Sequence, residues 1–128
     1  MVSAALKKRI LCVEDHEDTY DLIAFVLQDY EVVSARNVAD ALRSIIDHHF
    51  DLYLFDYNLP DGTGIELCIF LRTFDPVTPV VVATASSILS EREVLKSGAQ
   101  ALLRKGSDFT EDLEPIVTKL LTANAPGM

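Results

Sequence analysis

The sequence is poor in cysteine, in basic residues and in long apolar runs. Its only two cysteines, Cys12 and Cys68, lie inside apolar runs, which indicates reduced, buried thiols rather than a disulfide or a cysteine metal site. Lysine and arginine number 11 against 20 aspartates and glutamates, and the net charge of −9 argues against nucleic acid or an anionic membrane as a partner. No apolar run is long enough to cross a bilayer and no signal-peptide segment opens the chain, so we expect a cytoplasmic protein.

The remaining composition is typical of one soluble domain, because 49% of the 128 residues are apolar and can bury a core. Short apolar runs predict strands at 9–13, 31–34, 51–56, 80–84 and 101–103. The helices are expected to run from about 17 to 28, from Asn37 through 46, from Thr63 to about 73, from Ser90 to Gly98 and from about 110 to 121, with Pro115 in the first turn of the last one.

This alternation predicts a parallel sheet that is covered by helices on both faces. The expected fold is a flavodoxin-like (βα)5 three-layer sandwich with the strand order 2-1-3-4-5. We expect a single domain over residues 1–128, with its core at about 8–121 and a frayed tail at 122–128.

Polar side chains follow four of the five expected strands at the end where parallel sheets bind ligands: Glu14 and Asp15, Asp56, Thr84, and Lys105. The expected order puts the first and third strands side by side, about 4.8 Å apart, so Glu14, Asp15 and Asp56 should crowd together. Carboxylates that share a cleft repel one another unless a cation is present, and an open, all-oxygen site suits Mg²⁺.

Lys105 and Thr84 complete a reactive set around Asp56. The last strand should lie about 10 Å from the third, a distance that a lysine side chain can span, and Thr84 supplies a hydroxyl on the strand between them. A carboxylate nucleophile, a divalent cation, a hydroxyl and a lysine are the groups that phosphoryl transfer to Asp56 would need.

The ordered set of these residues strongly resembles the CheY-like receiver domain of two-component response regulators. The resemblance covers about residues 8–121 and depends on Val13-Glu14-Asp15, on the segment 55–64, on Ala83-Thr84-Ala85, and on Lys105. It implies that Asp56 is the phosphoacceptor, that Glu14, Asp15, Asp56 and the backbone carbonyl of Asn58 serve a Mg²⁺ site, and that Mn²⁺ is the alternative ion. It also implies that a histidine kinase or a histidine phosphotransfer protein is the donor.

The same resemblance assigns the remaining positions. Thr84 would contact the phosphoryl group and move on activation, Lys105 would pair with phosphoryl oxygens, and Asn58 and Ser86 would tune hydrolysis of the acyl phosphate. Two positions depart from the family pattern: Gly106 stands where the family usually has proline, and Leu102 stands where it usually has a tyrosine or phenylalanine that moves with the threonine. The usual coupling between threonine and ring is therefore not expected here.

Apolar residues at helical positions that receivers usually leave polar suggest a partner surface, either for a downstream protein or for a second copy of the chain. On the third expected helix these are Ile69 and Phe70, and on the first they are Tyr20 and Phe25.

Simpler interpretations stand beside each of these predictions. Glu14 and Asp15 suit a helix N-terminus, Asp56 suits a turn, Thr84 suits a strand end, and Lys105 suits an exposed surface. His16 is near the acids and could line the cleft, although the sequence favours an exposed side chain. Two rival functions also stay open. One is a docking module with the receiver fold that works without phosphate, which Leu102 and Gly106 favour. The other is a Mg²⁺-dependent phosphohydrolase, which would need an acid where the chain has Asn58 and a cap insertion for which it has no room.

Overall fold

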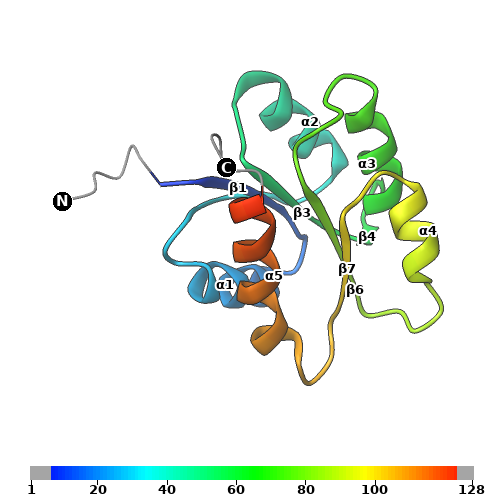
Figure 1. The fold of residues 1–128 in the computed structure, drawn as a ribbon. Coiled ribbons are helices and arrows are strands. Elements are labelled where there is room, and N and C mark those ends of the chain that lie inside the picture. The colour runs from blue at the N-terminus through cyan, green and yellow to red at the C-terminus, as the bar shows by residue number, and fades with distance from the viewer. Residues whose placement is uncertain (1–6, 124–128) are drawn as a thin grey trace.

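A parallel sheet of five strands forms the middle layer of the computed structural model, which describes residues 7–123 (Figure 1). Its strands are β1 (Arg9–Val13), β2 (Glu31–Ala35), β3 (Leu52–Asp56), β6 (Val80–Thr84) and β7 (Ala101–Arg104). They lie in the order β2-β1-β3-β6-β7. Counting only the strands of this sheet, that is the predicted order 2-1-3-4-5, and the flavodoxin-like fold class is confirmed.

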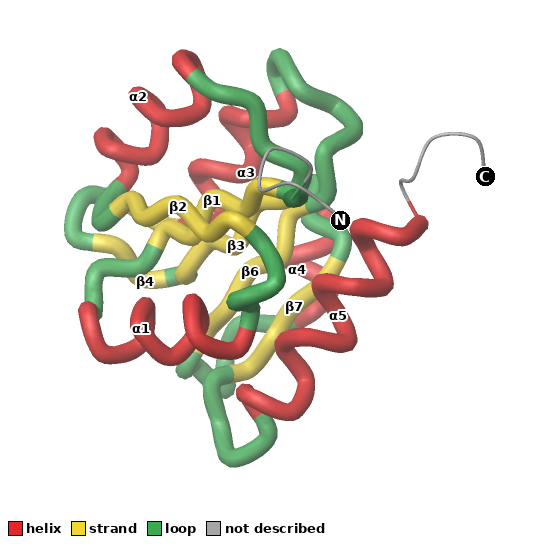
Figure 2. The backbone as a smooth tube through the Cα atoms, turned by 90° about the vertical axis from the view of Figure 1, so that its left-hand side faces the viewer, coloured by secondary structure: helices red, strands yellow, loops and turns green. Residues whose placement is uncertain are grey.

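Within the described residues, five helices cover the two faces of the sheet (Figures 1 and 2). On one face lie α1 (Glu17–Val26) and α5 (Phe109–Ala123), and on the other lie α2 (Val38–Asp47), α3 (Gly64–Arg72) and α4 (Glu91–Lys96). Because successive strand residues point to opposite faces, each strand contributes to two separate cores. Leu11 and Tyr53 face α2 and α3, whereas Ile10 and Leu52 face α1 and α5.

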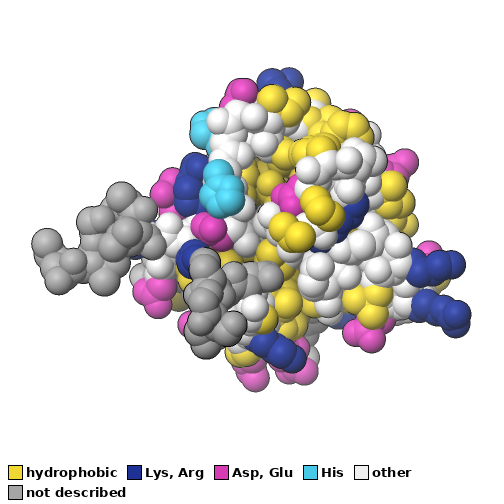
Figure 3. Space-filling model, turned by 45° about the horizontal axis from the view of Figure 1, so that its top comes forward, with side chains coloured by type: hydrophobic (Ala, Val, Ile, Leu, Met, Phe, Trp, Pro, Cys, Tyr) yellow, Lys and Arg dark blue, Asp and Glu magenta, His cyan; other side chains and the backbone are white. Residues whose placement is uncertain are grey.

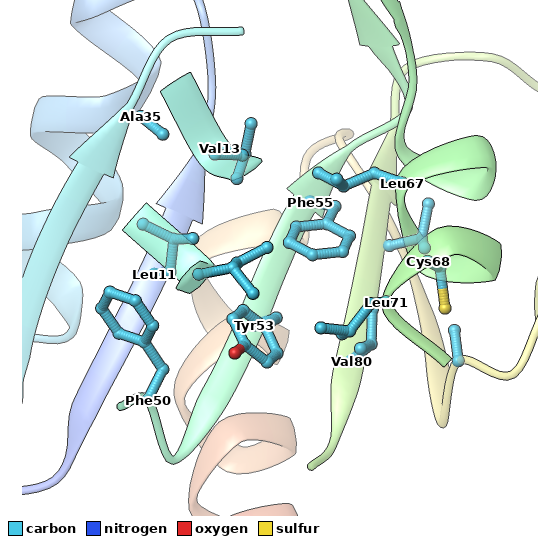
Figure 4. Close-up of a cluster of buried hydrophobic side chains, with 14 of the residues drawn as sticks. Leu11, Val13, Ala35, Phe50, Tyr53, Phe55, Leu67, Cys68, Leu71 and Val80 are labelled. Atoms are coloured by element: carbon cyan, nitrogen blue, oxygen red, sulfur yellow. The ribbon is translucent and has the colours of Figure 1, made fainter. Parts of the chain in front are cut away.

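The central strand β3 is buried along its whole length, since β1 and β6 flank it and helices cover both of its faces. Figure 4 shows Tyr53 and Phe55 of β3 beside Leu67 and Leu71 of α3. Both cysteines are free and buried, one in each core, as the sequence predicted. Burial raises the pKa of the Cys12 thiol far above its ordinary value, and the nearby carboxylate of Glu14 adds to this shift, so Cys12 is an unreactive core residue.

The predicted helix ends are confirmed by specific capping contacts. The Asn37 side chain accepts a hydrogen bond from the Asp40 backbone at 2.7 Å, and Thr63 and Ser90 each form a capping box with the glutamate three residues later. Gly98 follows α4 with a φ of 103°, a backbone conformation that favours glycine.

The structure differs from the predicted elements in three details. Helix α5 begins at Phe109, so Pro115 lies in its second turn rather than its first. Pro115 is exposed, and water can satisfy the carbonyl of residue 111 that receives no N–H from it.

A short antiparallel pair, β4 (Asn58–Leu59) and β5 (Gly62–Thr63), was also missed, because two-residue strands leave no periodic pattern. Of the tail predicted to fray, residues 122 and 123 belong to α5, and 124–128 lie outside the described residues.

Within residues 7–123, no helix combines the length and the apolar character that spanning a membrane requires.

Candidate functional site

The register of the sheet brings the predicted polar residues to one edge. Val13 is paired with Phe55, so Glu14 follows β1 where Asp56 ends β3, and Asp56 is paired with Ala83. The backbone N–H of Lys105 donates to the Thr84 carbonyl at 2.7 Å, which places the start of the loop after β7 beside the end of β6. Four strands therefore deliver their terminal side chains to one location.

Lys105 holds two of the acids together. Its Nζ lies 2.6 Å from Glu14 Oε1 and 3.0 Å from Asp56 Oδ1, although it comes from a strand two places away from β3. Glu14 and Asp56 are only 2% and 6% exposed, so the ammonium compensates charges that have little access to water. Burial alone would lower the pKa of Lys105, but the hydrogen bond to Glu14 and the charge of Asp56 outweigh it and raise that pKa.

The pKa of the Asp56 carboxyl is raised within this cluster. Burial raises its pKa from 3.8 to about 6, the Lys105 charge opposes that shift, and the neighbouring Glu14 and Asp15 carboxylates add to it. One lysine therefore does not neutralise the three acids, and the site favours a further cation.

The donor set of the site fits a divalent metal ion. Carboxylate oxygens of Glu14, Asp15 and Asp56 and a ring nitrogen of His16 all lie within 4.8 Å of one another. Asp15 Oδ1 is shielded from solvent and has no hydrogen-bond partner, which is costly for an ionised oxygen unless it meets a cation. Asn58, whose backbone carbonyl is the other predicted ligand, lies in β4 two residues after Asp56.

The residues predicted to take part in switching, and Ser86, which is predicted to tune hydrolysis, lie on β6 and β7 and in the segments that follow these strands. The Thr84 side chain is buried, and its Oγ1 accepts a hydrogen bond from the Ser86 backbone at 2.9 Å. Leu102 is half-buried against the core on the α3 side, where it fills space without a ring or a hydroxyl. A Cβ atom placed on Gly106 would meet nothing within 4 Å, so the structure itself does not require glycine there. The functional roles of these residues stay predictions.

Three contacts of the site carried no signal in the sequence. The Arg104 guanidinium donates to the carbonyls of Ser86 and Leu89, both at 2.9 Å, and so holds the loop that follows β6. Asp61, in the loop after β3, accepts from the first two backbone N–H groups of α2. The His16 ring turns toward the acids, and its side chain is 73% exposed, as the sequence favoured.

The predicted partner residues are exposed with one exception. Phe25, Ile69 and Phe70 are 68%, 54% and 48% exposed. Tyr20 is instead half-buried against the core on the α1 side, and its hydroxyl donates to the Val32 carbonyl at 3.3 Å. Hydrophobic side chains also gather on the side of the molecule that carries α2 and α3 (Figure 3). Self-association through these surfaces stays a prediction, and a protein that stays monomeric by light scattering at high concentration would contradict it.

The doubly wound parallel sheet carries acids and a lysine at the carboxyl ends of its strands. These features place the protein among small α/β domains whose acidic site can bind a metal ion. Residues 10–117 match the model of the response regulator receiver domain, and the chain belongs to that family. It is therefore a receiver domain of two-component signalling, a class of protein that acts as a signalling switch and typically uses Mg²⁺ and phosphorylation.

Similar proteins include both multidomain and single-domain response regulators. The chain is 34% identical to the response regulator protein PilR of Pseudomonas aeruginosa over 121 residues, which are 92% of this chain and 27% of PilR. It spans about a quarter of the length of PilR and of the related regulators ZraR and AtoC. It is 28% identical to the polar-differentiation response regulator DivK of Brucella anthropi, with coverage of 90% of this chain and 98% of DivK.

Solved structures agree with this assignment. The receiver domain of the Francisella response regulator 1452 superposes with a TM-score of 0.84 at 25% identity, covering 92% of this chain and 99% of that one. The response regulator TrrA from Thermotoga maritima, in complex with Mg²⁺ and BeF, gives a TM-score of 0.80 at 28% identity, covering 88% of this chain and 98% of that one.

The raised pKa of Asp56 predicts how the metal-free protein responds to pH. A carboxyl whose pKa is about 6 when folded, against 3.8 ordinarily, contributes stability that is complete below pH 3.8 and is lost as the pH rises through 6. In EDTA, Asp56→Asn should therefore be more stable than the wild type at neutral pH by about 1–3 kcal/mol, and this advantage should vanish below about pH 4. Urea unfolding at several pH values measures it, and a difference that does not change with pH would contradict the prediction.

Proposed function

We propose that Asp56 accepts a phosphoryl group from a phosphohistidine donor in a reaction that depends on Mg²⁺ or Mn²⁺, and that the resulting acyl phosphate switches protein–protein contacts. The observation that carries the proposal is the contact of Lys105 with both Asp56 and Glu14, beside a buried Asp15 oxygen that accepts no hydrogen bond. This arrangement brings together a nucleophile, a cation and oxygen ligands for a second cation.

The transfer follows from these positions. An Asp56 carboxylate oxygen forms the new O–P bond while the P–N bond to the donor imidazole breaks, and the imidazole leaves with the electron pair of that bond. Glu14, Asp15, Asp56 and the Asn58 carbonyl would hold the metal ion, which would offset the charge of the incoming phosphoryl oxygens. Lys105 already contacts Asp56, so its ammonium is placed to exchange Glu14 for a phosphoryl oxygen once the bond forms.

The donor in this proposal is a histidine kinase or a histidine phosphotransfer protein. The recipient of the signal is a downstream protein or a second copy of the chain. The cytoplasmic location predicted from the sequence remains a prediction.

Intact-mass measurement tests the proposal. The protein is incubated with Mg²⁺ and acetyl phosphate or phosphoramidate, and we expect one phosphoryl group per chain that disappears when EDTA replaces Mg²⁺. Absence of any adduct, together with absence of Mg²⁺ binding, would favour the docking module. Sustained turnover of a phosphate ester would favour the phosphohydrolase.

Leu102 is the feature that most favours the docking module, because it lacks the ring that the family usually has at this position. In the family a ring at this position moves together with the threonine, whereas Leu102 is half-buried against the core and carries no group that could bond Thr84. We propose that Arg104 provides a different link, because its two hydrogen bonds tie the loop after Thr84 to the end of β7, directly before Lys105. A shift of Thr84 toward a phosphoryl group would then have to move or break these bonds.

Removing this link should loosen the loop without affecting the core. In Arg104→Gln, hydrogen exchange of the backbone amides at 86–90 should be about fivefold to thirtyfold faster, since each of the two lost hydrogen bonds contributes about 0.5–1 kcal/mol. Arg92→Gln, which changes an exposed arginine of α4, is the matched control and should leave exchange in the loop unchanged. Equal exchange rates in the wild type and Arg104→Gln would show that the link does not restrain the loop.

A further inference from the structure

His16 is the one residue of the acidic site that the proposed function does not use. Its Nδ1 lies 3.3 Å from Glu14 Oε2 and 3.4 Å from Asp15 Oδ1. His16 also occupies the N-cap position of α1, where a polar side chain usually bonds the first turn of the helix, yet its side chain makes no capping hydrogen bond. The imidazole is therefore directed to the carboxylates rather than to the helix that it precedes.

The spacing of these donors is close to that of ligands around one ion. With bonds of about 2.1 Å, neighbouring ligands of a six-coordinate ion lie about 3 Å apart and opposite ones about 4.2 Å apart. The distances from His16 Nδ1 to Glu14 and Asp15 are close to the value for neighbours, and all four donors lie within 4.8 Å of one another. The Asp15 oxygen nearest the ring is the buried one that has no hydrogen-bond partner, which is an independent indication of a cation between them.

The position of the ring also suits a ligand at the rim of the site. Glu14 and Asp56 are nearly inaccessible, whereas the His16 side chain is 73% exposed. The His16 backbone N–H donates to Glu14 Oε2 at 3.2 Å, which holds the residue close to the acids while the ring can still turn. An ion that enters from solvent would thus meet the imidazole on its open side, opposite the buried carboxylates.

We propose that His16 Nδ1 is a ligand of the metal site and gives it a preference for Mn²⁺ and other first-row transition ions over Mg²⁺. Imidazole nitrogen is a good ligand for transition ions, whereas Mg²⁺ favours oxygen ligands and retains its waters. The inference depends on the metal site of the proposed function, but it concerns a residue and a selectivity that the phosphoacceptor chemistry does not require.

Calorimetric titration with Mn²⁺ alone and with Mg²⁺ alone tests the inference on the full chain. The wild type should bind Mn²⁺ more tightly than Mg²⁺, and His16→Ala should weaken Mn²⁺ binding about tenfold or more with less than about a twofold effect on Mg²⁺. His49→Ala is the matched control, because His49 is also a largely exposed histidine, and its Nε2 lies 3.3 Å from Asp51 Oδ1, away from the site. It should change neither affinity, and the retained Mg²⁺ affinity of His16→Ala shows that this variant is folded.

A spectroscopic measurement on the Mn²⁺ complex needs no comparison of affinities. Electron spin-echo modulation from a histidine ¹⁴N nucleus should be present in the wild type and His49→Ala and absent in His16→Ala. Unchanged Mn²⁺ affinity in His16→Ala, or a wild-type complex without nitrogen modulation, would overturn the role of His16 and leave the phosphoacceptor site intact. A wild type that binds neither ion would overturn the metal site and the His16 ligand together.

Discussion

Replacing Asp56 with asparagine is expected to abolish the phosphoryl adduct entirely. The amide has nearly the shape of the carboxylate and can still contact Lys105, which lies 3.0 Å from Asp56 Oδ1, but it has no anionic oxygen that can attack phosphorus. After incubation with Mg²⁺ and acetyl phosphate, the intact mass of Asp56→Asn should be that of the unmodified chain, while the wild type gains one phosphoryl group.

Asp61→Asn is the matched control for this loss. Asp61 is an exposed carboxylate five residues further along, and its oxygens accept hydrogen bonds from the backbone N–H groups of Val38 and Ala39. An asparagine keeps one acceptor oxygen there, so the variant should stay folded and keep the adduct. An adduct that survives in Asp56→Asn and disappears in Asp61→Asn would show that the acceptor had been misidentified.

The second large effect is expected at Gly64, the first residue of α3. A Cβ atom at this position would lie 2.5 Å from the backbone oxygen of Asp56 and 3.2 Å from the Phe55 Cβ. Neither neighbour can turn away, because both belong to the buried central strand. Gly64→Ala should therefore lower the free energy of unfolding by about 1–3 kcal/mol, the range found when buried atoms are added to a packed core. It should also slow formation of the adduct, since relief of the clash must displace Asp56.

Gly106→Ala provides the comparison for Gly64→Ala. A Cβ atom there would meet nothing within 4 Å, and the φ angle of Gly106 is not positive, so alanine should be neutral or slightly stabilising. Urea unfolding of both variants measures the difference. If Gly64→Ala were as stable as Gly106→Ala, the close approach of α3 to the Asp56 carbonyl would be wrong.

Much of the site could be predicted because its residues directly follow apolar runs. A run such as Leu52–Phe55 is typical of a strand that is buried on both faces, and the position of Asp56 at the end of β3 then follows. The meeting of Glu14, Asp56 and Lys105 needed one further assumption, the strand order, which the sequence supported only through the alternation of strands and helices.

The contacts that could not be predicted are those made by side chains whose direction depends on tertiary packing. Nothing in the residues around His16 distinguishes a ring that faces the acids from one that faces water. Arg104 reads as one of two adjacent surface charges, and its hydrogen bonds to Ser86 and Leu89 depend on the path of the loop after β6. The place of Pro115 in α5 also depends on tertiary packing. A helix tolerates the missing N–H of proline where that face of the helix is exposed, and the structure shows that Pro115 is exposed.

Contacts of Lys105 and Arg104 bear on the two departures from the family pattern, Gly106 and Leu102. Lys105 is held by Glu14 and Asp56, so Gly106 does not leave it without restraint. Leu102 removes the usual ring, but Arg104 joins the loop after Thr84 to the strand that carries Lys105. The phosphoacceptor chemistry and the route by which it would alter the surface are thus separable, and variants of Arg104 test the second without touching the first.

Chemical localisation of the acyl phosphate is the most direct test of the central claim. Borohydride reduces an aspartyl phosphate to homoserine, so the wild type is phosphorylated in the presence of Mg²⁺, reduced, digested and analysed by fragment-ion mass spectrometry. We predict homoserine at position 56 and at no other aspartate. Homoserine at Asp15 or Asp61, or no homoserine in a sample that carries a phosphoryl group, would contradict the assignment of Asp56 as the phosphoacceptor.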